Sequence, residues 1–200
     1  MQVIGEKSDS LAPLQVKDLA SAIVITFDRP ESRSPLSLTV LGQIEEIIVK
    51  LVESNDQRRL IFTGKERVFA SGADLTEIAG LAAFNAADFS RRGQGLMSLI
   101  SAHPVPTIAA INGVCYGGAL DLAIACQRRI AGPNAKFCHP GAGLGIMTGW
   151  GGTQRLPRLI GQANALEMFM TAMPIGPSDA LRIGLVDVVA DDPLAEALNF

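Results

Sequence analysis

The glycines of this chain are unevenly distributed, and their largest cluster constrains the fold more than any other feature of the sequence. Ten of the 20 glycines lie between residues 113 and 152. The pair Gly117-Gly118 lies between the apolar run Thr107–Ile111 and an apolar segment that extends through Cys126. Because glycine permits tight turns and close approach of two backbones, this pattern predicts a buried strand, a tight turn and a helix that begins at the glycine pair.

Short apolar strands alternate with amphipathic helices along the rest of the chain, and this alternation predicts an α/β fold. The chain has 200 residues, 48% of them hydrophobic, which provides for a sizeable core. No change of composition divides it into two independent domains. The expected strands cover 14–17, 22–27, 60–63, 107–111 and 186–189, and the expected helices cover 38–53 after Ser37, 84–100, 117–126, 154–160, 163–170, 179–183 capped by Ser178, and a last one from Asp192-Pro193.

Composition excludes several classes of function. The formal net charge is −3 and the pI about 5.4, which argues against a nucleic-acid partner or a polybasic membrane surface. The apolar run before Cys126 is interrupted by Asp121 and is too short to span a bilayer. The three cysteines form no CxxC pair and there are only two histidines, so no metal site is expected. Unpaired thiols and the lack of a secretory signal favour a cytoplasmic protein.

Three well-known phosphate-binding and catalytic motifs are absent from the glycine-rich stretches. The dinucleotide-binding motif fails at Ile146, where its last glycine is required. The P-loop fails at Glu66, where serine or threonine is required after Gly-Lys. Ser71 lacks the flanking glycines of a nucleophile elbow, which argues against a serine hydrolase.

The predicted helix start carries the strongest candidate site. A helix N-terminus behind Gly117-Gly118 can bind an anion or a developing oxyanion, although small residues also serve tight strand–helix packing. Asp121 lies about one turn into this helix among apolar residues, where a raised pKa would suit acid/base chemistry. Its alternative role is a favourable interaction with the helix dipole. His139 is either a packed, hydrogen-bonded core residue or part of the site.

Several gapped stretches, taken in order, resemble the crotonase (enoyl-CoA hydratase/isomerase) superfamily. The resemblance covers nearly the whole chain from about residue 14. It implies a spiral of repeated β-β-α units and an acyl-CoA thioester as the substrate, with no cofactor. The matching stretches are 27–31, 69–75, 106–121, 135–137 with Pro140, 144–146, 151–158 and 180–186.

The resemblance also assigns residues to the site. It implies that the backbone N–H groups of Ala73 and Gly118 form an oxyanion hole for the thioester enolate, with Asp121 as the catalytic acid/base. The CoA moiety is expected along the segment after Arg29-Pro30. The substrate-binding residues that the resemblance implies are Ala70, Gly72, Asp74, Leu75 and Gly117.

The chain departs from the superfamily at the catalytic carboxylates. Hydratases of this kind use two glutamates, and the corresponding positions here are Asp121 and Gly141. Asp121 keeps one carboxylate on a shorter side chain, whereas Gly141 has none, so hydration by two carboxylates is in question. His139 is the nearby titratable substitute and a possible auxiliary residue. Decarboxylation, C–C cleavage, thioester hydrolysis and a non-catalytic acyl-CoA-binding or assembly subunit are the alternatives.

The resemblance also predicts the organisation of the chain. We expect a loose leader over residues 1–13, a spiral core over 14–190, and over 191–200 the start of a C-terminal helical region that ends early. Crotonases continue beyond the stretch corresponding to 184–186 with further helices, so this C-terminal helical part is expected to be missing or shortened. The superfamily further implies a homotrimer or a dimer of trimers.

Overall fold

The computed structural model describes residues 12–200. The predicted leader therefore lies, apart from its last two residues, outside the described residues. Among residues 12–200, no helix combines the length and apolar character needed to cross a bilayer.

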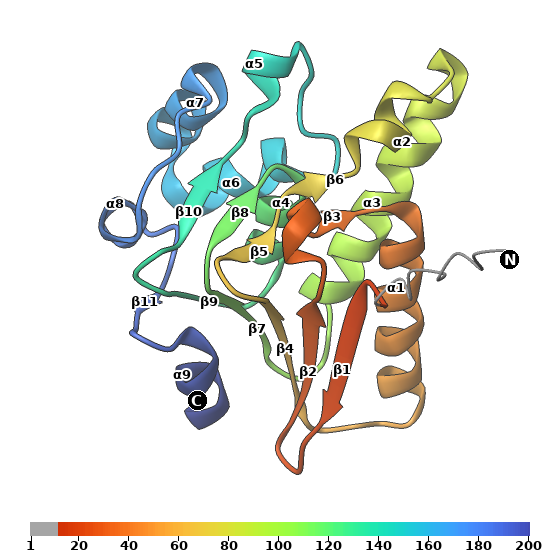
Figure 1. Cartoon of the computed structure of the whole chain (residues 1–200), viewed down its shortest axis with the longest axis vertical. Helices are drawn as coiled ribbons and strands as arrows, with labels where there is room; N and C mark the ends of the chain where they lie inside the picture. Colours follow the sequence, from red (N-terminus) through yellow and green to blue (C-terminus); the bar gives the residue numbers. More distant parts are fainter. Residues whose placement is uncertain (1–11) are drawn as a thin grey trace, which may run out of the picture.

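A six-stranded sheet forms the base of the molecule (Figure 1). Its neighbouring strands are parallel, except that the first two form an antiparallel hairpin. The parallel strands follow one another in chain order, as expected when each turn of a spiral adds one strand to the sheet. In spatial order the strands are β1 (Leu14–Asp18), β2 (Ala22–Phe27), β4 (Arg59–Gly64), β7 (Thr107–Ile111), β9 (Arg128–Ala131) and β11 (Val188–Val189).

Each turn of the spiral contributes its second strand to another sheet, which is parallel and has three strands. It consists of β5 (Val68–Ala70), β8 (Val114–Tyr116) and β10 (Lys136–Cys138), and each of these follows directly on a strand of the large sheet. A further parallel pair joins β3 (Pro35–Leu36) to β6 (Gly72–Ala73). This architecture confirms the predicted α/β spiral of β-β-α units. The short strands of the second sheet, at most three residues each, carry too little periodicity to be predicted from sequence.

Helices close each turn and cover the sheets (Figure 1). Ser37 caps the first helix as predicted, since its hydroxyl accepts a hydrogen bond from the Val40 N–H at 3.3 Å.

The predicted Ser178 cap is wrong, because Gly176 is the N-cap and Pro177 is the first residue of that helix. Phe84 belongs to a separate 3₁₀ turn, Ala83–Asn85. The helices are α1 (Leu38–Glu53), α2 (Leu75–Ala79), α3 (Ala86–Ser101), α4 (Gly118–Ala125), α5 (Gly141–Leu144), α6 (Gly152–Ile160), α7 (Gln162–Thr171), α8 (Pro177–Arg182) and α9 (Pro193–Asn199).

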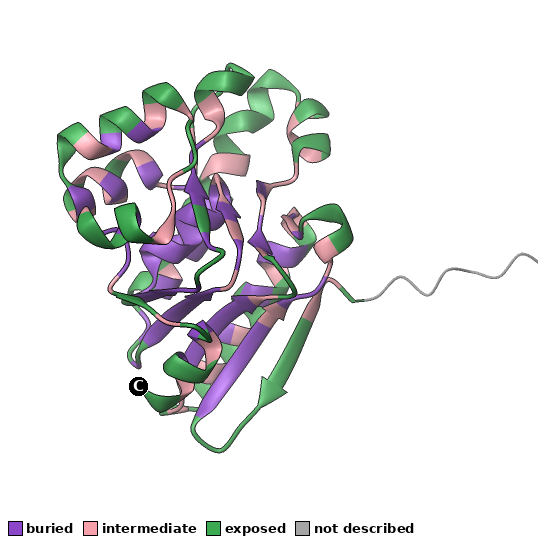
Figure 2. Ribbon diagram, turned by 60° about the vertical axis from the view of Figure 1, so that its left-hand side comes forward, coloured by how far each residue is buried: buried purple, intermediate pink, exposed green. Residues whose placement is uncertain are grey.

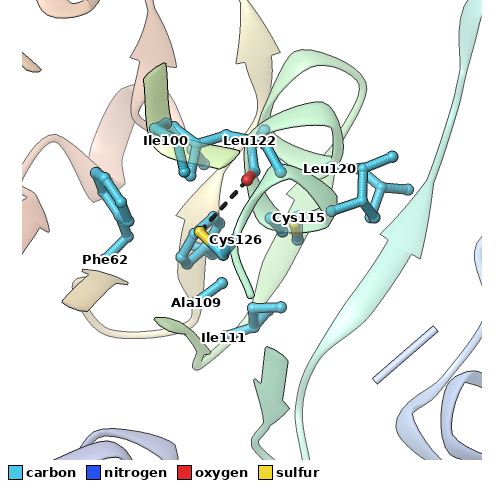
Figure 3. Close-up of a cluster of buried hydrophobic side chains, with 14 of the residues drawn as sticks. Phe62, Ile100, Ala109, Ile111, Cys115, Leu120, Leu122 and Cys126 are labelled. Atoms are coloured by element: carbon cyan, nitrogen blue, oxygen red, sulfur yellow. Dashed lines mark hydrogen bonds between the residues drawn. The ribbon is translucent and has the colours of Figure 1, made fainter. Parts of the chain in front are cut away.

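Helix α4 lies in the main core, and all eight of its residues are buried. Figure 2 shows this buried interior surrounded by helices with exposed outer faces. Figure 3 shows Leu120 and Leu122 of α4 near Cys115 of β8 and side chains of β4 and β7. The three cysteines are unpaired, as predicted. Burial raises the pKa of the Cys126 thiol to about 12, which keeps it protonated at neutral pH.

The outer face of the large sheet carries a smaller core under α9. Strand β2 alternates between the two cores, because Ile23 and Ile25 face the main core while Val24 belongs to the smaller one. Leu194 of α9 packs against this smaller core. Asp192 caps α9 by accepting from two backbone N–H groups, both at 3.0 Å. Residues 191–200 thus pack directly against the spiral core.

A buried arginine ties the segment before β11 to the large sheet. Arg129 is only 6% exposed, and its guanidinium donates to the carbonyl oxygens of Leu185 and Cys126, each at 2.8 Å. Its third partner is the carboxylate of Asp187, at 2.9 Å. The same carboxylate accepts the backbone N–H of Arg129 at 2.8 Å, and the backbone N–H of Asp187 donates to the Arg129 carbonyl at 2.9 Å, so three hydrogen bonds join Asp187 to Arg129 of β9.

We predict that Asp187→Ala lowers the free energy of unfolding by about 2 kcal/mol, because it leaves the Arg129 charge buried without its counter-ion. Asp179→Ala is the control, since Asp179 pairs with Arg182 on the surface, where both side chains are more than half exposed. That substitution should change the stability by less than about 0.5 kcal/mol. Urea unfolding measures both values, and equal effects of the two variants would contradict the structural role of Asp187.

Candidate active site

The candidate site begins at the N-terminus of α4. Gly117 is the N-cap, with φ 52° and ψ −121°, a backbone conformation that favours glycine. Its N–H donates to the carbonyl of Cys138 at 2.8 Å, and its carbonyl accepts the N–H of Asp121 at 3.0 Å. Gly118 is the first residue of the helix, where a backbone N–H has no partner within the helix. The predicted helix start is therefore confirmed.

The segment that carries Ala73 lies in direct backbone contact with this helix start. A Cβ placed on Gly72 would lie 2.7 Å from the Gly118 nitrogen, and one placed on Gly118 would lie 3.2 Å from the Ala73 nitrogen. The same Cβ placed on Gly118 would lie only 2.3 Å from a ring carbon of Trp150. Tight packing at the glycine pair is thus confirmed. The backbone N–H groups of Ala73 and Gly118, which are predicted to form the oxyanion hole, belong to two segments in contact with each other. Their role remains a prediction.

The other residues named for substrate binding gather around the same segment. Ala70 is fully buried at the end of β5, and Leu75 is 54% exposed at the start of α2. Asp74 caps α2 by accepting the Thr76 N–H at 2.8 Å. The chain after Arg29 reaches this segment through the β3–β6 pair, so the two stretches expected to contact CoA lie side by side.

Asp121 is a buried carboxyl group, 1% exposed, in the second half of the first turn of α4. Its Oδ2 accepts a hydrogen bond from the hydroxyl of Thr148. Burial raises the pKa of Asp121 to about 7, while the Thr148 hydroxyl, the backbone N–H of Trp150 and the charge of Arg155 act in the opposite direction. The raised pKa predicted from the apolar sequence around Asp121 is therefore confirmed.

His139 follows β10 and lies beside Asp121. Its Nε2 is 3.7 Å from Asp121 Oδ1, and the residue is 3% exposed. The imidazole packs against the ring of Phe169, with 5.0 Å between centroids. His139 is thus packed in the core, as one of the two alternatives expects, and neither ring nitrogen has a hydrogen-bond partner among residues 12–200. Burial lowers the pKa of His139 to about 4, which leaves the imidazole neutral at neutral pH.

Gly141 is the first residue of α5 and has no room for a side chain. A Cβ at this position would lie 2.4 Å from the carbonyl oxygen of Ile146. The N–H of Ile146 donates to the Gly141 carbonyl at 3.0 Å, and this hydrogen bond joins the two ends of the 141–146 loop. A glutamate at position 141 would therefore require the 141–146 loop to move.

Sequence reasoning missed the loop that completes the site. Thr148 and Trp150 both contact α4, but only the folded chain brings them there. Thr148 also lines a polar cavity of about 450 Å³ between α3 and α6, and the side chain of Arg155 lies in its wall. The cavity is lined by Ser90, Gln94, Ser98, Thr148, Gly149, Gly151, Thr153, Gln154, Arg155 and Arg158. No group of three or more His, Cys, Asp and Glu side chains within residues 12–200 is arranged to hold a metal ion.

We predict that Asp121→Asn makes the protein more stable than the parent at high pH. The folded-state pKa of Asp121 is raised from 3.8 to about 7, so the parent loses stability as the pH rises through this range. Asparagine does not ionise, and the stability gap between variant and parent should widen by roughly 2–3 kcal/mol from about pH 5 to about pH 8. Urea unfolding across this range measures the gap. A gap independent of pH would contradict the prediction.

Comparisons with known proteins agree with this architecture. The sequence profile of the enoyl-CoA hydratase/isomerase family matches residues 18–198. A crotonyl-CoA hydratase from Syntrophomonas wolfei is 39% identical over 188 residues, which are 94% of this chain and 68% of that protein.

Solved structures show the same fold. An enoyl-CoA hydratase from Bacillus anthracis superposes with a TM-score of 0.88 at 34% identity, over 94% of this chain and 74% of that one. Pseudomonas aeruginosa DspI gives 0.87 at 31% identity, over 97% and 80%. On the sequence profile, the identities and the shared spiral, the chain belongs to the enoyl-CoA hydratase/isomerase family of the crotonase superfamily.

Proposed function

We propose that this protein is an acyl-CoA enzyme in which the N–H groups of Ala73 and Gly118 stabilise a thioester enolate and Asp121 transfers the proton. The observation that carries the proposal is the placement of a buried carboxyl group, with a pKa of about 7, three residues after a helix start in backbone contact with Ala73. The family supplies the acyl-CoA substrate class.

The chemistry explains why these groups belong together. Removing a proton next to a thioester carbonyl, or adding a nucleophile to the conjugated double bond, moves negative charge onto the carbonyl oxygen. Two fixed N–H donors stabilise that charge without reorganising, and the N-terminus of α4 adds the positive end of its dipole at Gly118. This step requires no metal or redox group.

Asp121 suits the proton transfer because its pKa lies near neutrality. At about pH 7 both its protonated and its ionised forms are populated, so it can accept a proton in one step and return it in the next. The apolar residues of α4 that raise this pKa also exclude bulk water from the carboxyl group.

The proposed reaction is the reversible hydration of a 2-enoyl-CoA, in keeping with the relative named crotonyl-CoA hydratase. Isomerisation, decarboxylation, C–C cleavage and thioester hydrolysis also place negative charge on the thioester carbonyl oxygen. They are alternatives that would use the same N–H groups of Ala73 and Gly118. The second candidate is a non-catalytic acyl-CoA-binding or assembly subunit. The absence of a carboxylate at Gly141 favours that candidate, and the retained Asp121 favours an enzyme.

We predict that the protein turns over at least one acyl-CoA thioester and that Asp121→Asn lowers kcat by at least about 100-fold, the usual contribution of a general acid/base. The assay covers a panel of enoyl-, hydroxyacyl- and malonyl-type thioesters. Asp88→Asn, on the exposed face of α3, is the matched control and should keep full activity. Calorimetry with CoA measures binding separately.

The outcomes separate the two candidates. Full turnover by Asp121→Asn would show that Asp121 is not the acid/base. Binding of CoA without turnover of any thioester would replace the enzyme by the binding subunit.

We further propose that the chain assembles as a homotrimer or a dimer of trimers, as the family resemblance implies. Exposed apolar side chains on and around α5 and α7 support association. They include Leu144, Met147, Leu166, Met170 and Met173, each more than half exposed. Light scattering should give a mass of at least three chains, and a monomer mass at micromolar concentration would contradict the assembly.

A further inference from the structure

The only tryptophan of the chain, Trp150, is buried between two helices. A Cβ placed on Gly93 of α3 would lie 2.1 Å from Cδ1 of the indole, and one placed on Gly118 of α4 would lie 2.3 Å from Cζ3. Phe89 of α3 also packs on the indole, with 5.7 Å between the ring centroids. The ring therefore lies directly against the backbone of both helices, at positions where only glycine leaves room for it.

One edge of the indole lies beside the predicted oxyanion hole. The Cβ position of Gly118 that lies 2.3 Å from the ring lies 3.2 Å from the backbone nitrogen of Ala73. The indole and the Ala73 nitrogen are thus both in contact with the same point. A thioester whose carbonyl oxygen is bound by the N–H groups of Ala73 and Gly118 would therefore lie next to Trp150.

The residues on either side of Trp150 contact the carboxyl group of Asp121. Thr148 binds Oδ2 through its hydroxyl, and a Cβ placed on Gly152 would lie 2.1 Å from Oδ1. An acyl chain whose Cα lies within reach of Asp121 must therefore run beside residues 148–152. This stretch carries one large side chain, that of Trp150, so the indole is the group that the acyl chain meets.

The indole has little freedom to make room for a longer acyl chain. Trp150 is 2% exposed, and the backbones at Gly93 and Gly118 enclose it together with Phe89. A close-packed interior does not accept extra methylene groups without strain. The ring therefore sets a fixed end to the space for the acyl chain.

We propose that Trp150 restricts the substrate to short acyl groups, because its indole occupies the space into which a longer chain would extend from the oxyanion hole. The substrates are then acyl-CoA thioesters of the size of crotonyl-CoA, and octenoyl-CoA is excluded by contact with the ring. This inference rests on the proposed function and names the substrate class for it.

Two substitutions of Trp150 test its role. Trp150→Ala removes the ring, and Trp150→Leu keeps a smaller apolar side chain, so that a variant closer to the native packing is also tested. Phe62→Leu is the matched control, because Phe62 is a fully buried aromatic residue of strand β4 that stacks on Phe27. Thermal unfolding checks that each variant is folded.

The first measurement is kcat/KM for hydration of crotonyl-, hexenoyl-, octenoyl- and decenoyl-CoA. We expect the parent to prefer crotonyl-CoA over octenoyl-CoA by at least about 100-fold, since one methylene group in a pocket changes kcat/KM by about 10–200-fold. Trp150→Ala should lower this preference by at least about 10-fold. Trp150→Leu should lower it less, and Phe62→Leu should leave it unchanged.

The second measurement requires no turnover. Because Trp150 is the only tryptophan, its fluorescence reports directly on contact with a bound acyl group. Titration with butyryl-CoA should change the emission, whereas CoA without an acyl group should not. In calorimetry, octanoyl-CoA should bind the parent at least about 10-fold more weakly than butyryl-CoA, and this difference should disappear in Trp150→Ala.

Each result decides the inference. Equal efficiency of the parent with crotonyl-CoA and octenoyl-CoA would overturn the role of Trp150 and leave the proposed function in place. An equal loss of preference in Phe62→Leu, or an emission that bound butyryl-CoA leaves unchanged, would overturn that role as well. If no thioester is turned over, a chain-length preference in binding that depends on Trp150 supports the inference, and its absence contradicts it. Absence of both turnover and CoA binding would overturn the proposed function and this inference together.

Discussion

The complete burial of α4 is the constraint on which the rest of the structure depends. A helix with no exposed residue must be enclosed on every side, and here the two sheets, α3 and α6 enclose it. This requires small residues where the backbone meets its neighbours, as at Gly118 against Trp150. The same burial takes Asp121 out of water and brings its pKa near neutrality. Core packing and the raised pKa of Asp121 therefore have one origin, so a change that loosens α4 alters both.

The sequence predicts well what depends on local chemistry. Ser37 and Asp192 cap their helices because a short polar side chain at a helix start accepts the free backbone N–H groups. Asp121 could be singled out, together with its raised pKa, because apolar residues flank it on both sides. The spiral was predicted from the order of gapped motifs, since the strands of the second sheet are too short to show a pattern of their own.

Features that depend on contacts between distant segments could not be predicted in this way. Thr148 lies 27 positions from Asp121, and nothing in its neighbourhood marks its hydroxyl as a partner of that carboxyl group. Ser178 has the right residue type for a cap, but Pro177 has the fixed φ that suits a first helical position, so the helix begins two positions earlier than predicted. For His139, the sequence leaves two roles open, and its 3.7 Å distance to Asp121 is a contact between segments that the sequence does not indicate.

The lost carboxylate at position 141 is part of a connected set of differences. The 141–146 loop closes through the hydrogen bond between Ile146 and Gly141 and leaves no space for a Cβ, so a glutamate cannot simply be restored there. The imidazole of His139 lies beside Asp121, is buried and neutral, and has no hydrogen-bond partner within residues 12–200. Thr148 binds Oδ2 of Asp121, and Oδ1 of the same carboxyl group lies 3.7 Å from His139 Nε2. The closed loop thus leaves no place for an acid at position 141, and the neutral imidazole of His139 is a titratable group that lies beside Asp121.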